Sequence, residues 1–230
     1  MIGKLFGRGK RDDPSAPFYR PYGDQAADFL YNLLFCDNPD LFRNGEHGTS
    51  SLAAALSCAA TREMLEMIAA DPAVESRVRM LAFNRLRAMK VPTPAKQLLG
   101  AIIEFPQDDG LDTLAAFADG RVRYINQTGK PAIFEGAPPE VVAKANELMR
   151  VSQLAIDRHG PSDEPRRPPP TGDLVRLSFL ASDGLYFGEG SYERLMDDAA
   201  GGPVLTAGGE LLVQLVDSVV PAQPKPGTRA

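Results

Sequence analysis

The chain has 230 residues, of which 43% are hydrophobic and 24% charged, and its formal net charge is −5. This length and apolar content suffice for a buried core, and the lack of any apolar run of about 18 residues excludes a transmembrane helix. Two cysteines are too few for a disulfide scaffold, and the first residues, MIGKLFGRGKR, contain no apolar stretch of signal-peptide length. We therefore expect a cytoplasmic protein.

The charge is unevenly distributed along the chain. Residues 1–100 carry a net charge of +2 and residues 101–230 a net charge of −7. An acidic second half argues against a nucleic-acid platform, because such platforms bind by neutralising phosphates. The N-terminal tip (residues 1–11) mixes basic residues with Ile2, Leu5 and Phe6, a pattern typical of peripheral membrane contact. Three apolar residues bury too little area for stable anchoring.

Residues 1–22 are rich in glycine, proline and charge, which predicts a flexible arm. Residues 23–90 show apolar positions at helical spacing, which predicts a helical region of four or five short elements. Helix-start signals recur along this region, in which a capping side chain precedes each helix and proline often follows it. They are Asp24, Asn38-Pro39, Thr61 and Asp71-Pro72.

Residues 95–159 change to a period of two, which indicates strands, followed by a helix from Pro139 to about Arg158. The turn signals Asp109-Gly110, Asp119-Gly120 and Thr128-Gly129 separate four short segments. Asp-Gly is typical of type I′ hairpin turns, in which both central residues have positive φ, so we expect a four-stranded antiparallel meander. On its third strand we expect Arg123 to face solvent.

Residues 160–172 predict an extended, proline-rich linker. Residues 173–220 predict a hairpin around Asp183-Gly184 and two helices, the second over 209–219 with Leu211, Leu215 and Val216 buried. The pairs Gly201-Gly202 and Gly208-Gly209 are expected to end helices or form turns. Residues 221–230 predict a disordered tail.

The overall expectation is an α+β fold: an N-terminal helical region, an antiparallel meander with flanking helices, and a C-terminal hairpin–helix segment. That last segment can either join the main sheet or form a separate unit. We favour one six-stranded sheet, because a lone hairpin is marginally stable in water.

The residue patterns predict no cofactor and no metal. Asp108, Asp109 and Asp112 do not have the ligand spacing of a calcium loop. The segment Gly184–Gly190 is not followed by the Lys-Ser/Thr pair of a phosphate loop. Cys36, His47 and Cys58 lack the spacing of a zinc site or a catalytic thiol, and we expect both cysteines to be buried packing residues.

Three stretches together resemble segments of uncharacterised bacterial proteins. They are ESRVRMLAFNRLR (residues 75–87), GLDTLAAFADGRVRYIN (residues 110–126) and GLYFGEG (residues 184–190). The resemblance covers about a third of the chain. It implies a bacterial cytosolic protein and carries no activity.

The leading hypothesis for function is a non-enzymatic interaction or accessory protein with a protein partner, because no catalytic set, metal spacing or phosphate loop is present. The sequence leaves its oligomeric state open. An alternative is a small-molecule enzyme that uses Glu104, Asp112, Tyr124 and Glu189 where sheet and helices meet. A second alternative is peripheral membrane association through residues 1–11.

Overall fold

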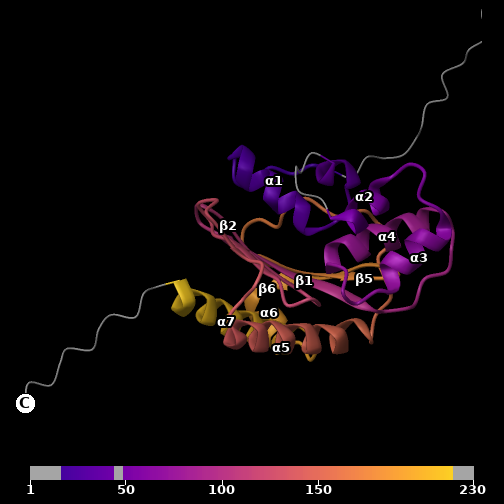
Figure 1. Ribbon diagram of the computed structural model, residues 1–230. Coiled ribbons are helices and arrows are strands. Elements are labelled where there is room, and N and C mark those ends of the chain that lie inside the picture. The colour runs from indigo at the N-terminus through magenta and orange to yellow at the C-terminus, as the bar shows by residue number, and fades with distance from the viewer. Residues whose placement is uncertain (1–16, 44–48, 220–230) are drawn as a thin grey trace, which may run out of the picture.

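The computed structural model describes residues 17–43 and 49–219. The basic tip at residues 1–11, His47 and the C-terminal tail at 221–230 lie outside these ranges. Within them the fold is α+β, as expected, with one antiparallel sheet held between two layers of helices (Figure 1). None of the helices within these ranges is both long enough and apolar enough to span a bilayer.

Six strands form the sheet in the order β4-β3-β2-β1-β5-β6. Central strand β1 pairs with β2 on one side and with β5 on the other, so the C-terminal hairpin joins the main sheet, as we favoured. The strands are β1 (Leu98–Gln107), β2 (Gly110–Phe117), β3 (Val122–Ile125), β4 (Pro131–Phe134), β5 (Leu174–Ala181) and β6 (Gly184–Ser191).

The N-terminal helices cover the first face of the sheet (Figure 1). Predicted caps begin three of these elements, since the side chains of Asp24, Asn38 and Thr61 each accept backbone N–H groups. Asp71 instead caps a short turn by accepting from Ala73, and the next helix starts later than predicted. The elements are α1 (Gln25–Leu34), η1 (Pro39–Phe42), α2 (Ser50–Leu56), α3 (Arg62–Ala70) and α4 (Ser76–Ala88).

Helices α5 (Pro139–Ile156), α6 (Tyr192–Asp197) and α7 (Gly201–Val219) cover the second face (Figure 1). Because helices lie on both sides, β1 is apolar on both faces. Leu99 and Ile102 belong to the core of the first face, and Ala101 and Ile103 to that of the second.

Helix α7 begins earlier than predicted, and both glycine pairs lie inside it, so the expectation that they end helices was wrong. Gly208 has a packing role: a Cβ there would lie 2.3 Å from Cδ1 of Ile103 in β1. The missing side chain therefore lets α7 approach the sheet closely. Val216, expected to be buried, is 51% exposed.

The hairpins at the Asp-Gly dipeptides are confirmed, but the expected I′ geometry is wrong at all three, because Asp109, Asp119 and Asp183 do not have positive φ. Gln107 pairs with Gly110 across the hairpin, so Asp108 and Asp109 form the loop. Neither Asp109 nor Gly110 has positive φ. A Cβ on Gly110 would lie 2.2 Å from the carbonyl oxygen of Gln127, so this glycine is needed for a close backbone approach.

Arg123, expected to face solvent, is only 5% exposed. Its guanidinium donates to the carbonyl of Phe134 at 3.2 Å and forms an ion pair with Glu135. Helices cover both faces of the sheet, so the side chains on either face of β3 can be buried. The alternating polar and apolar pattern of this strand therefore did not predict which side chains are exposed.

The segment expected to be a linker forms a strap (residues 160–173) that is fastened to the first face. Arg166 is 6% exposed, its guanidinium carbon lies 4.2 Å from the ring centroid of Phe35, and its Nε donates to Asp37 at 2.7 Å. Residues 17–22 of the expected arm also pack, since Tyr22 shares a hydrogen bond of 2.8 Å with Thr113. Two segments outside the helices and strands, residues 17–22 and 160–173, are therefore held against the fold by specific side-chain contacts.

Candidate functional site

Glu104 is sealed inside the first face of the sheet. It is 0% exposed, and the hydroxyl of Tyr31 donates to its Oε1 at 2.6 Å. Oε2 has no hydrogen-bond partner among the described residues, and burial raises the pKa of this carboxyl. In this conformation no surface of Glu104 is open to a substrate.

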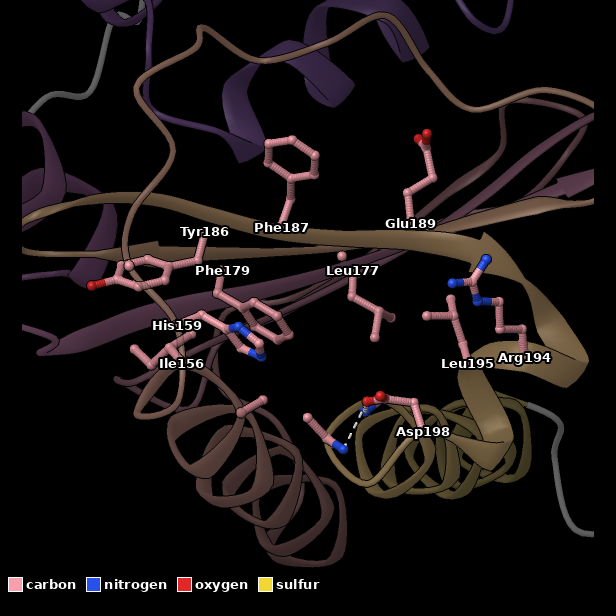
Figure 2. A pocket seen from close by; sticks show the side chains of 15 residues that line it. Ile156, His159, Leu177, Phe179, Tyr186, Phe187, Glu189, Arg194, Leu195 and Asp198 are labelled. Carbon is pink, nitrogen blue, oxygen red and sulfur yellow. Dashed lines mark hydrogen bonds between the residues drawn. The ribbon is translucent and has the colours of Figure 1, made fainter.

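Glu189 is part of an ion pair on the same face. Nε of Arg176 donates to its Oε2 at 2.8 Å, and Arg176 also donates to the carbonyl of Pro168 in the strap at 2.6 Å. Figure 2 shows the side chain of Glu189 directed away from the neighbouring pocket. This carboxylate therefore helps to fasten the strap.

Asp112 and Tyr124, the other two candidates, come together on the second face. The hydroxyl of Tyr124 donates to Oδ1 of Asp112 at 3.0 Å, and the backbone N–H of Gln127 donates to the same oxygen at 2.8 Å. Burial and the neighbouring carboxylate raise the pKa of Tyr124, so its phenol stays protonated at neutral pH. Oδ1 of Asp112 therefore accepts two hydrogen bonds, while its Oδ2 accepts none from the described residues.

The pair borders the aromatic pocket, a cavity of about 310 Å³. Phe105 and Tyr192, both in its lining, pack edge-to-face against each other with ring centroids 5.7 Å apart. Its lining carries one carboxylate, and none of its described lining residues is basic. The lining is Ile103, Phe105, Gln107, Asp112, Leu114, Tyr124, Tyr192, Leu205, Gly208, Gly209 and Leu212.

A second cavity, the hairpin pocket, lies between the β5–β6 hairpin and helices α5, α6 and α7 (Figure 2). Its volume is about 340 Å³, which falls in the range of small-molecule sites. Leu177 and Phe179 on β5, Ile156 on α5 and Leu195 on α6 supply most of its apolar surface.

Besides Tyr186 and Glu189, three residues with ionisable side chains line the hairpin pocket: His159 after α5, Arg194 on α6 and Asp198 after α6. In Figure 2, His159 and Asp198 reach toward the cavity from opposite sides. Oδ1 of Asp198 accepts from the N–H groups of Gly201 and Ala200 at 2.7 and 2.8 Å. These hydrogen bonds lower the pKa of Asp198, so it is ionised at neutral pH, and its Oδ2 is left to meet a ligand.

Sequence reasoning missed these three residues. Asp198 carried a usable signal, since it precedes Gly201-Gly202 at the spacing of a helix cap. The signal was lost because the two glycines were expected to end a helix. His159 and Arg194 carried no signal, because only the packing of α5 and α6 on the hairpin brings them together.

The described residues offer few groups for covalent or metal chemistry. No cluster of three His, Cys, Asp or Glu side chains within residues 17–43 and 49–219 could hold a metal ion. Cys36 is buried, as expected, and burial raises the pKa of its thiol. Cys58 is exposed, contrary to expectation, and borders neither pocket.

Comparison with protein-family models, with curated proteins and with solved structures gives no match to the chain.

Proposed function

We propose that this protein binds a small organic molecule in the hairpin pocket and releases it unchanged. The observation that carries the proposal is the pairing of an apolar cavity of about 340 Å³ with three ionisable groups at its border. The proposal keeps the non-enzymatic class expected from the sequence, but makes the partner a small molecule.

The chemistry of the lining indicates a ligand with an apolar body and a polar end. Leu177 and Phe179 offer the body an apolar wall, whose burial drives binding. Arg194 can donate to a ligand oxygen, and Oδ2 of Asp198 can accept from a ligand hydroxyl or amine. A few convergent polar groups beside an apolar wall are typical of specific small-molecule sites.

Several features favour binding over turnover. The described lining contains no Ser, Thr, Cys or Lys to act as a nucleophile. Tyr186 already donates to Asp183 at 2.9 Å, and burial raises the pKa of its phenol to about 12, so it is a poor acid or base at neutral pH. Glu189 is held by Arg176 on the other face of the sheet.

Gly188 gives the proposal a sharp test. It borders the pocket, and a Cβ built on it would meet no atom within 4 Å, so Gly188→Leu should fill the cavity without straining the backbone. Gly136→Leu is the matched control, because Gly136 is also surrounded by open space and lies outside both pockets.

The experiment measures thermal unfolding of the three full-length proteins against a set of small apolar acids, alcohols and amines. A compound at about 100 times its Kd stabilises the protein that binds it by about 2.7 kcal/mol. We expect stabilisation of the wild type and of Gly136→Leu, and none of Gly188→Leu. Equal stabilisation of all three, or of none, would contradict the proposal, and recovery of a chemically altered compound would favour an enzyme.

A further inference from the structure

The aromatic pocket has a chemistry that the proposed function does not use. Phe105, Tyr124 and Tyr192 contribute three aromatic rings to one cavity, and among its described lining residues Asp112 alone carries a charge. Aromatic faces carry negative electrostatic potential and attract cations that lie over them. The aromatic rings and the carboxylate therefore both favour a positively charged ligand.

The carboxylate is held in place and is not neutralised. Tyr124 and the backbone of Gln127 both donate to Oδ1 of Asp112, which fixes the plane of the group. No Lys, Arg or His among the described residues lies within 4 Å of Asp112 as an ion-pair partner, and its Oδ2 accepts no hydrogen bond from them. One face of a fixed anion is thus available at the edge of an aromatic cavity.

We propose that the aromatic pocket is a second binding site whose ligand is an alkylammonium ion. The ammonium group lies against the rings of Phe105, Tyr124 and Tyr192 and is attracted by Oδ2 of Asp112. The apolar floor formed by Ile103 and Leu205 contacts its alkyl groups. A neutral ligand of the same shape gains the apolar contact and loses both electrostatic attractions.

Two sources supply this chemistry: a free amine such as choline, and the side chain of a lysine in another protein. The cavity is open toward solvent at Tyr192, which is 47% exposed, so either source can reach it. The shared group is the alkylammonium, and the two sources are separated by the choice of probe.

The test is calorimetric titration of the full-length protein with choline, with its neutral isostere 3,3-dimethylbutanol, and with N-acetyl-lysine methylamide. Asp112→Asn keeps the acceptor for Tyr124 and Gln127 but removes the charge. Asp108→Asn is the matched control, because Asp108 lies in the adjacent hairpin loop and does not border the pocket. Tyr192→Leu removes one ring at an exposed position.

We expect at least one cation to bind about ten-fold or more tightly than the neutral isostere. Asp112→Asn should remove most of that difference, Tyr192→Leu should weaken binding about three-fold, and Asp108→Asn should leave it within two-fold. The tighter of the two cations identifies the source. Failure of both cations to bind, equal binding of the isostere, or equal effects of the two asparagine variants would overturn the proposal, provided that circular dichroism shows folded proteins.

Discussion

The close approach of α7 to the sheet can be tested with two neighbouring glycines. Gly208 and Gly209 both lie inside α7, so alanine at either gains the same helix propensity, about 0.5–1 kcal/mol. A Cβ at Gly209 meets no atom within 4 Å, whereas at Gly208 it would lie 2.3 Å from Cδ1 of Ile103. Ile103 is only 8% exposed, and its Cδ1 can avoid the new methyl group only by taking another rotamer beside the aromatic pocket that it lines. Overpacking of a core costs about 1–3 kcal/mol.

Gly209→Ala should therefore raise the free energy of unfolding by about 0.5–1 kcal/mol, and Gly208→Ala should lower it by about 1–2 kcal/mol. Urea unfolding followed by circular dichroism measures both values, and unchanged m-values show that the unfolded states remain comparable.

Ile103→Val completes a double-mutant cycle, because it removes the Cδ1 atom that the new methyl group meets. Alone it should cost about 1 kcal/mol. The double mutant should be more stable, by about 1 kcal/mol or more, than the sum of the two single-mutant changes in the free energy of unfolding predicts, because the clash is relieved. Equal stabilisation by the two glycine substitutions, or simple additivity in the cycle, would refute the argument that Gly208 is needed for packing.

Three further predictions concern groups inside the fold. Arg166→Ala should lower the free energy of unfolding by about 3 kcal/mol, because it leaves Asp37 without its buried partner, and Arg166→Lys should restore less than half of that loss. In the same urea titration, Arg62→Ala breaks a solvent-exposed pair and should leave the free energy of unfolding almost unchanged. Burial raises the pKa of Glu104, so its contribution to stability is full below the unfolded carboxyl pKa of about 4.3 and is lost as pH rises through the folded value. The wild type should therefore lose stability relative to Glu104→Gln between pH 5 and 8, and a constant difference in urea unfolding across that range would contradict this. Gly110→Ala should cost about 3 kcal/mol, because its Cβ meets a backbone oxygen that cannot rotate away; a change in thermal unfolding as small as that of Gly136→Ala would rule out the clash.

The fold was predictable where the signals were local. Asp119-Gly120 and Asp183-Gly184 mark hairpins that the sheet contains, and Asp24 and Thr61 begin helices as capping side chains. The two-sided apolar pattern of β1 also agreed with its central position. These features depend on a few adjacent residues, so they can be predicted from local sequence patterns.

The remainder depended on contacts between distant residues. Gly208 belongs in a helix only because Ile103, on another element, needs the space, and glycine propensity alone predicted a turn. Arg166 is buried because the rings of Tyr31 in α1 and of Phe35 at its C-cap lie against the guanidinium, whereas the proline-rich neighbourhood predicted exposure.

The candidate site divides in the same way. Asp112 and Tyr124 lie on adjacent strands of a predicted hairpin, so the contact between them could be predicted from the sequence. The surroundings of Glu104 and Glu189 depend on the long-range pairing of β1 with β5, which no local signal fixes. The hairpin pocket requires three helices to meet β5 and β6, and only packing decides that.

The strand order has a consequence for synthesis of the chain. Strand β1 can pair with β2 as soon as a two-residue loop has formed, but its other neighbour, β5, begins at Leu174. Until the ribosome has released that segment, one side of a strand rich in leucine and isoleucine has unpaired backbone groups. Such edges pair readily with other chains. The growing polypeptide therefore passes through an interval in which a chaperone would raise the yield of folded protein, whereas slow elongation before Leu174 would prolong the exposure of β1 and lower it.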